Sequence, residues 1–316
     1  MARYLDPKND LTFKRIFGEH PDLLIDFLNA LMPLTADRLI EEIEYLPAEQ
    51  VPDIFGKKNS IVDVKCKDRS GQVFIVEMQM LWTDDFMNRI VFNASKAYVR
   101  QLEKNMGYHL LQPVYTFAIL NENYDHRSEN FYHHYGIVNR ENTDEVIEGL
   151  EFVLVELRKF KSEKWGERKI AALWLQFLKE VGENMTSLPA ELAQNERIRK
   201  AAELCEEGAF TFEELALYES YWDWVRTEKT IREGSLAKGL AEGEAIGLKK
   251  GEAIGLEKGE TIGMKRGEAI GLEKGRADEK TEIALKLLRM GMSIKDASSV
   301  TGLSKEHIEK LNENRE

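Results

Sequence analysis

Two acidic residues, Asp63 and Glu77, have the spacing of facing residues in a β-hairpin. They lie in the segment 61–80, in which two runs rich in apolar residues flank a short polar stretch. Gly71 suits the left-handed position of a three-residue loop over residues 69–71. In the register that this loop sets, the sequence predicts Asp63 directly opposite Glu77.

The chemistry of such a pair depends on what lies between the two carboxylates. Cross-strand neighbours have Cβ atoms about 4.5–5.5 Å apart, and two negative charges at that distance destabilise the sheet. A divalent cation would relieve the repulsion, and Mg²⁺ prefers hard oxygen ligands. Asp63 and Glu77 are therefore candidate metal ligands. The spacing leaves open a solvated edge hairpin with Lys65 as counter-charge, and a register slip of one residue would remove the pair.

The predicted register also sorts the hairpin residues into two faces. One face carries the polar chemistry, and its residues are Ile61, Asp63, Lys65, Ile75, Glu77 and Gln79. The opposite face is apolar and is expected to pack into the core through Val62, Val64, Cys66, Phe74, Val76 and Met78.

The elements that must hold this hairpin belong to a mixed α/β body. Apolar residues at helical spacing predict a helix that Pro21 breaks, and β-branched and aromatic runs predict strands. In chain order we expect a helix over 9–31, a strand over 38–46, a helix over 84–105, strands over 114–120, 131–138 and 150–157, and a helical region over 165–231. The tyrosines and tryptophans are expected to serve the core or an interface rather than to stack on nucleic-acid bases.

Charge divides the chain near residue 230. Of the 56 acidic and 44 basic residues, 16 of each lie in 231–316, so the net charge of -12 belongs to 1–230. An acidic balance argues against a protein that simply coats nucleic acid. The tail has no Phe, Trp or Tyr, so a catalytic or binding domain is expected within 1–230.

Signs of export are absent from the sequence pattern. The two cysteines, Cys66 and Cys205, cannot form a disulfide framework and fit a reducing compartment. The charged start lacks the apolar segment of a signal peptide, and no run of about 18 apolar residues predicts a membrane span. We therefore expect a cytoplasmic protein that does not contact membranes.

Residues 231–276 contain a repeat in which glycine recurs at every fourth position from Gly239 to Gly275. Each glycine costs a helix about 1 kcal/mol relative to alanine, so an isolated helix of this composition would be marginal. The repeat is consistent with a semi-helical spacer. It is also consistent with a helix that self-associates, which would make the protein a homo-oligomer.

Residues 277–316 have the pattern of three short helices in a helix-turn-helix-like unit. Gly291 is placed to end the first helix, Ser293 with Asp296 resembles a capping box, and Ser304 is placed to cap the third helix. The third helix is mixed in charge rather than basic, so docking of a protein is favoured over binding of DNA.

A set of short motifs follows one order along the body. In chain order they are Asp10, Phe13 and Lys14 with Ile16-Phe17-Gly18, then the strand with Asp63, Glu77-Met78-Gln79, Arg89, Ser95-Lys96-x-Tyr98, Gln101-Leu102, Tyr108 and Pro113-Val114. This order resembles the Rpn family of recombination-promoting nucleases, also named as transposases, in the PD-(D/E)XK nuclease superfamily. The resemblance covers residues 5–230 or so, and the glycine repeat with its short C-terminal helices also looks like the usual tail of that family.

The resemblance implies a nuclease-like domain over 1–230, with a restriction-endonuclease-like mixed sheet flanked by helices and followed by a helical C-terminal tail. It implies a Mg²⁺-dependent DNA endonuclease that promotes recombination, with Asp63 and Glu77 as metal ligands. The metal would polarise the scissile phosphate and activate a water. The alternative is a catalytically weak DNA-binding or regulatory protein that keeps the nuclease fold and self-associates through its tail.

The superfamily usually has a lysine where this chain has Gln79. A glutamine can hydrogen-bond a water but carries no charge, so Lys65 on the same face, or Lys96 on the following helix, could supply the charge. Arg89, Lys96 and Lys14 are the residues that we expect to contact DNA.

Other acidic residues and two histidines are further candidates for the site, and their positions in the sequence decide between them. Asp10 on the first helix is expected to complete the site, with Glu19 less favoured. Asp53 follows a proline, as in the superfamily's name, but precedes the predicted strand and is set aside. His133 and His134 are adjacent, so on a strand they point to opposite faces and are poor joint metal ligands.

Overall fold

The computed structural model describes residues 3–50, 60–161 and 169–313. The chain divides into two compact units, Met1–Arg232 and Glu233–Glu316. Asp53, which the sequence pattern sets aside, lies outside the described residues.

A six-stranded mixed sheet forms the centre of the first unit, with the strand order β1-β4-β5-β6-β8-β7. β5 pairs with β6, and β6 with β8, in parallel. The other neighbouring strands are antiparallel. The strands are β1 (Ile43–Tyr45), β4 (Val64–Asp68), β5 (Val73–Gln79), β6 (Val114–Leu120), β7 (Tyr132–Val138) and β8 (Val146–Glu156). A separate ladder joins β2 (Glu49–Gln50) to β3 (Ser60–Ile61). The predicted mixed α/β sheet is confirmed.

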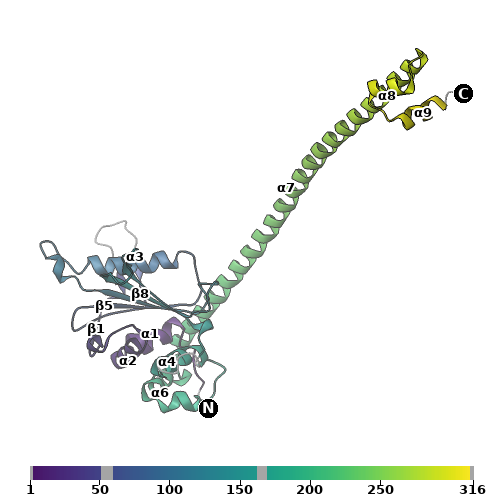
Figure 1. Cartoon of the computed structure of the whole chain (residues 1–316). Coiled ribbons are helices and arrows are strands. Elements are labelled where there is room, and N and C mark those ends of the chain that lie inside the picture. Colours follow the sequence, from purple (N-terminus) through teal and green to yellow (C-terminus); the bar gives the residue numbers. More distant parts are fainter. Residues whose placement is uncertain (1–2, 51–59, 162–168, 314–316) are drawn as a thin grey trace. The chain divides into compact units, whose positions relative to one another are not determined.

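Helices cover both faces of this sheet (Figure 1). One face carries α3 (Phe86–Val99), and the other carries α1 (Asp10–Gly18), α2 (Pro21–Leu31) and α4 (Lys169–Glu180). The short helices α5 (Ala190–Gln194) and α6 (Glu196–Glu203) contact α4. The helix break at Pro21 is confirmed, since proline opens α2 at a position where its missing N–H has no intrahelical partner to lose.

Two predicted elements are shorter than the sequence pattern indicated. The strand expected over 38–46 is reduced to β1, because the side-chain amide of Asn29 hydrogen-bonds both the N–H and the C=O of Ile40 at 2.8 Å. The helix expected over 84–105 ends at Val99, and Asn105 adopts a positive φ of 76° that a right-handed helix does not contain.

The predicted register of the hairpin is confirmed from Val64 opposite Val76 to Lys67 opposite Val73. The predicted strand pair of Asp63 with Glu77 is not formed, because the ladder ends at Val64. Gly71 has a φ of 89°, as the three-residue loop requires. The alternative of a solvated edge hairpin is wrong, because β5 lies between β4 and β6 and its face toward α3 is covered. One face assignment also fails: Val62 packs with residues under α3 because the chain bends at Asp63.

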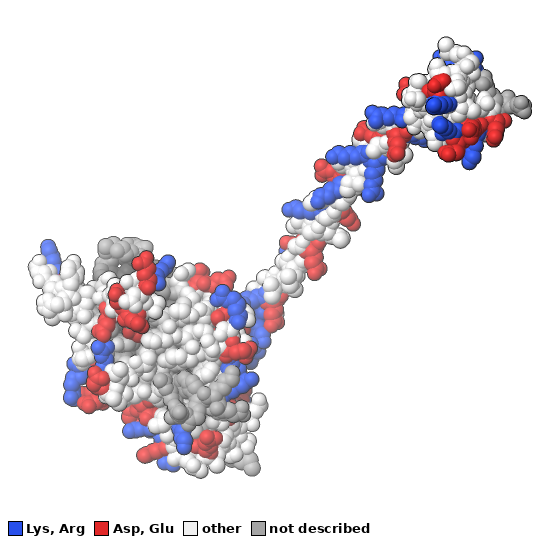
Figure 2. All heavy atoms as spheres, viewed as in Figure 1, with Lys and Arg blue, Asp and Glu red and all other residues white. Residues whose placement is uncertain are grey.

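The second unit contains most of a long helix, α7 (Phe212–Arg289), which begins in the first unit, and two short helices, α8 (Ile294–Thr301) and α9 (Lys305–Glu313). Among the described residues, and apart from the adjacent backbone of α7 itself, no heavy atom lies within 4 Å of the position that a Cβ would take at the repeat glycines from Gly239 to Gly275. Acidic and basic side chains alternate along this helix (Figure 2). A small core of Ala284, Ala297 and Ile308 joins the end of α7 to α8 and α9.

The predicted helix ends of the tail are confirmed. Gly291 has a φ of 85°, Ser293 accepts from the N–H of Asp296, and Ser304 accepts from the N–H of His307, the last two at 3.2 Å. The first of the three predicted short helices is not separate, because helix-forming residues continue α7 without a break through 277. Among the described residues, no helix is both long enough and apolar enough to cross a bilayer.

Candidate active site

Asp63 lies at a break between two strands. The chain bends there after β3 and before β4, so Asp63 is outside the ladder that pairs β4 with β5. Its Oδ2 accepts a hydrogen bond of 2.7 Å from the backbone N–H of Met78. Because Met78 directly follows Glu77 on β5, this bond fixes the Asp63 carboxylate beside the backbone that carries the second acid.

Both acids line one cavity of about 230 Å³. Three other residues singled out in the sequence also line it, namely Asp10, Gln79 and Arg89. The structure therefore brings together five of the predicted site residues, from α1, the hairpin and α3. Their chemical roles stay predictions.

Glu77 is only 5% exposed, and its two oxygens have different partners. The side-chain amide of Asn93 donates to Oε1 at 3.1 Å, and the Arg89 guanidinium lies 3.6 Å from Oε2. Asn93 is one helical turn after Arg89, so both side chains project from the same face of α3. These two contacts hold the Glu77 carboxylate from α3.

Burial makes the ionised form of both acids costly. It raises the pKa of Asp63 to about 7, and the nearby charges of Glu77 and Asp10 add to this rise, whereas the Met78 N–H and Lys14 counter it. Burial also raises the pKa of Glu77, although Arg89 and Asn93 oppose the effect. Two carboxylates in one small cavity are therefore an environment that favours either protons or a bound cation.

Gln79 and Arg89 bind each other. The Gln79 side chain donates to the carbonyl of Leu81, and its Oε1 accepts from Arg89. The Arg89 guanidinium also lies 5.0 Å above the ring of Phe86. Both ends of the Gln79 amide are thus occupied within the chain, so the amide must change partners before it could orient a water.

The structure places Lys14 beside this cavity. Its Nζ lies 2.8 Å from the carboxylate of Asp10, one turn earlier on α1, and both side chains are about half exposed. Glu19, the less favoured acid, is exposed and does not line the cavity.

Lys65 and Lys96 do not line the cavity. Lys65 is half-buried toward the C-terminal end of α3, where burial and the charges of Arg100 and Lys96 lower its pKa. Lys96 donates to the backbone carbonyl of Gln50. The cations that line the cavity, among the described residues, are Arg89 and Lys8. Strand alternation puts Lys65 on the same face as the acids, but it does not show that Lys65 lies near the C-terminal end of α3, by Lys96 and Arg100. The sequence pattern therefore grouped Lys65 with the acids.

Sequence reasoning missed four residues of the site, which are Lys8, Asn93, Tyr221 and Trp224. Asn93 could have been found from its helical spacing to Arg89. Tyr221 and Trp224 carry no such local signal, because they reach the cavity through the packing of α7 against the body.

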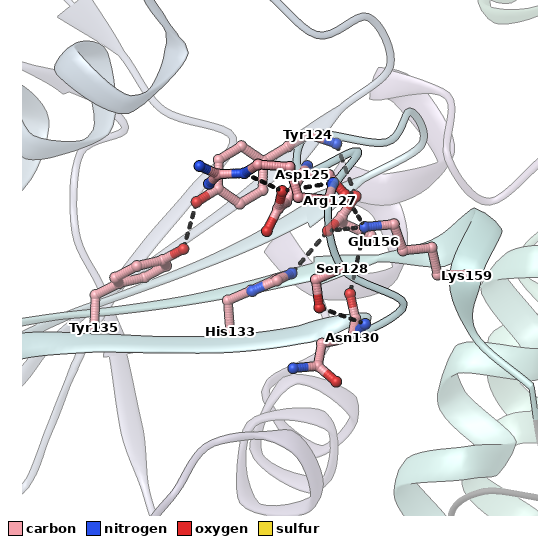
Figure 3. Close-up of polar contacts among 9 residues, drawn as sticks. All are labelled: Tyr124, Asp125, Arg127, Ser128, Asn130, His133, Tyr135, Glu156 and Lys159. Atoms are coloured by element: carbon pink, nitrogen blue, oxygen red, sulfur yellow. Dashed lines mark hydrogen bonds and ion pairs between the residues drawn. The ribbon is translucent and has the colours of Figure 1, made fainter.

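The histidines belong to a different cluster, shown in Figure 3. His133 Nε2 lies 2.7 Å from the fully buried carboxylate of Glu156, which also pairs with Lys159 and accepts from the backbone N–H of Tyr124. His134 contacts Glu151 instead, at 2.6 Å. The contacts of Glu156 with His133 and Tyr124 join the end of β8 to β7 and to the loop after β6, so the cluster ties these segments together.

A larger cavity, of about 680 Å³, lies at the end of α4. It shares Lys8 with the smaller cavity, but Lys8 donates to the carbonyl of Leu178 and pairs with Asp6 at 2.8 Å. Its acids and bases are therefore engaged with each other or with backbone. The smaller cavity differs in that two buried acids, Asp63 and Glu77, line it together.

The residues of the small cavity fit a divalent cation. Among the described residues, no three His, Cys, Asp or Glu side chains converge into a complete metal site. Mg²⁺ does not need one, because it usually keeps several waters and takes one or two protein carboxylates. Oδ1 of the buried Asn93 has no hydrogen-bond partner in the described structure, so an oxygen acceptor remains for a water beside Glu77.

Comparison with known proteins gives one match. Residues 7–231 match the protein family described as PD-(D/E)XK nuclease family transposase. Neither the curated proteins nor the solved structures gave a match. The matched range contains every residue placed in the small cavity.

Proposed function

The chain belongs to the family of PD-(D/E)XK nuclease family transposases, and from this premise we propose that it is a Mg²⁺-dependent DNA endonuclease that promotes recombination. The observation that carries the proposal is the cavity in which Asp63 and Glu77 meet. Two buried acids with raised pKa values are the arrangement that a hard divalent cation stabilises.

Asp63 and Glu77 would hold the cation through carboxylate oxygens. When bound, Mg²⁺ polarises a phosphoryl oxygen and lowers the pKa of a coordinated water. The Met78 N–H orients the Asp63 carboxylate, and the Asn93 amide orients that of Glu77. These two hydrogen bonds restrict the motion of both acids before any substrate arrives.

The positive side chains of the cavity would meet the phosphate backbone of DNA. Arg89 is 45% exposed and is the cation closest to Glu77, so we assign it the contact with the scissile phosphate. Lys14, beside Asp10, would contact a neighbouring phosphate. Lys96 lies outside the cavity and would act at a greater distance from the reaction. Lys65, on β4, does not line the cavity either, and the catalytic role expected of it stays a prediction.

A plasmid assay tests the proposal. Supercoiled DNA is incubated with the purified full chain and Mg²⁺, and we expect nicked and linear products that Asp63→Ala and Glu77→Ala abolish. Glu44→Ala is the matched control, because Glu44 is an exposed acid on β1 that pairs with Lys67 outside the cavity. Undiminished cleavage by both site variants would contradict the assignment of the site.

One observation favours the alternative function, a catalytically weak DNA-binding or regulatory protein. Gln79 replaces a charged residue and its amide is occupied by Arg89 and by the Leu81 carbonyl. On this alternative the full chain binds DNA but does not cut it with Mg²⁺ or with any other divalent cation tested. Either activity fits a reducing compartment such as the cytoplasm, since Cys66 and Cys205 are free thiols.

A further inference from the structure

Two large apolar side chains, Ile61 and Trp224, line the small cavity. Trp224 lines the cavity and is nevertheless 56% exposed, and Ile61, which also lines it, is 67% exposed. Large apolar side chains at such exposure lose hydrophobic stabilisation unless a ligand covers them. The carboxylates of Asp63 and Glu77 form the floor of the same cavity.

Trp224 packs against a second aromatic residue of α7, Tyr221. Its ring centroid lies 6.1 Å from that of Tyr221, which packs against the core of the first unit. Burial raises the pKa of Tyr221, and the charges of the nearby Asp63 and Asp10 raise it further, so it stays a neutral phenol. The aromatic pair therefore stands beside the acids rather than on a distant part of α7.

The charge of the first unit limits how it can hold a polyanion. Residues 1–230 carry the net charge of -12, so their acidic side chains outnumber the basic ones and their overall field opposes a polyanion. Phosphate contacts supply most of the affinity in proteins that coat nucleic acids. A base stacked on an aromatic ring contributes about 1–3 kcal/mol and does not depend on net charge.

We propose that Trp224 is a stacking platform for an unpaired nucleobase next to the scissile phosphate. The substrate class is then DNA with unstacked nucleotides, such as single strands or frayed ends, rather than intact duplex. Inside a duplex both faces of a base are covered by its neighbours, so only an unpaired or terminal base offers a face to Trp224. This inference rests on the proposed nuclease function for the phosphate beside the base, but the stacking itself requires no cleavage.

Binding measured without metal tests the stacking separately from the reaction. The full chain in EDTA is titrated into a fluorescein-labelled 12-nucleotide single strand, the corresponding duplex, and a strand of equal length whose central nucleotides are abasic. Fluorescence anisotropy gives each dissociation constant. The variants are Trp224→Ala and Trp224→Phe, and the matched control is Phe212→Ala, an aromatic on α7 that is 87% exposed and does not line the cavity.

We expect the wild-type chain to bind the single strand more tightly than the duplex or the abasic strand. Trp224→Ala should weaken single-strand binding by about fivefold or more, which corresponds to a loss of at least about 1 kcal/mol. It should leave binding of the abasic strand unchanged. Trp224→Phe should retain most of the affinity, and Phe212→Ala should match the wild type.

The outcomes separate the two proposals. If Trp224→Ala weakens binding while the wild-type chain cuts no DNA, the base site stands and the nuclease function falls. If the chain cuts DNA but Trp224→Ala binds the single strand as tightly as the wild type, the base site falls and the nuclease function stands. Equal wild-type affinity for single strand and duplex, or no binding of either, also overturns the base site.

Discussion

The carboxylate of Asp63 accepts a hydrogen bond of 2.7 Å from the backbone N–H of Met78, the residue after Glu77. Asp63 thereby takes the place of a strand partner at the point where the ladder between β4 and β5 ends. One bond satisfies the N–H of Met78 and sets the position of an acid in the cavity. The metal-free protein should therefore respond to changes at Asp63 in both stability and chemistry.

The first prediction concerns the pH dependence of stability in EDTA. Asp63→Asn keeps an oxygen that can accept from Met78 but removes the charge that burial disfavours. We expect this variant to be more stable than the wild type at pH 8, by an amount on the order of a few kcal/mol. Thermal unfolding followed by circular dichroism at a series of pH values measures the difference.

The direction of this pH dependence follows from the raised pKa of Asp63. A carboxyl whose pKa is about 7 in the folded chain and 3.8 in the unfolded chain stabilises the fold most below pH 3.8. That stabilisation is lost as the pH rises through about 7. The advantage of Asp63→Asn should therefore be small at pH 4, grow up to pH 7, and remain constant above it. An advantage that shrinks with rising pH would contradict the assigned shift.

The second prediction concerns Mg²⁺. A ligand that binds only the folded chain at ten times its Kd stabilises that chain by about 1.4 kcal/mol, which is about 3–6 °C for a domain of this size. We expect Mg²⁺ to raise the Tm of the wild type and to have little effect on Glu77→Gln. Glu44→Gln, an exposed acid outside the cavity, should respond as the wild type does. Equal shifts in all three proteins would remove Glu77 from the metal site.

The third prediction concerns Arg89, whose guanidinium contacts both Glu77 and Gln79. Arg89→Ala removes a positive charge that competes with a metal cation for Glu77, so Mg²⁺ should bind several-fold more tightly in calorimetry. The same variant should bind a DNA oligonucleotide more weakly, because it lacks a phosphate contact. Arg69→Ala is the control, since Arg69 is exposed, pairs with Glu42 and does not line the cavity. Weaker Mg²⁺ binding by Arg89→Ala would show that Arg89 supports the metal site instead.

The parts of this site that could be predicted from the sequence are those that depend on residues close together in the chain. The register of the hairpin follows from Gly71, and the start of α2 follows from Pro21, because both depend on backbone geometry within a few residues. The bend at Asp63 could not be foreseen, since alternation alone predicts one continuous strand. Tyr221 and Trp224 reach the cavity only after α7 packs against the body, and no pattern within α7 encodes that contact.

The last prediction concerns the glycine repeat. The positions of Gly247, Gly251 and Gly255 have open space for a Cβ within the chain. Replacing all three with alanine should therefore strengthen the helix by about 1 kcal/mol per site. We expect a larger helical signal at 222 nm and a higher melting temperature for the tail. Gly291→Ala should do the reverse, because its φ of 85° disfavours any residue with a side chain.

The same triple variant separates the two interpretations of the tail. A spacer gains helicity on alanine substitution and its sedimentation does not change. A helix that self-associates through close backbone approach loses that contact when each glycine gains a methyl group, so an oligomer of the wild type would dissociate. Sedimentation velocity of the full chain decides between them. A lower tail melting temperature in the triple variant, accompanied by dissociation, would show that a second copy covers the glycines, because no other segment of the described chain lies within 4 Å of these positions.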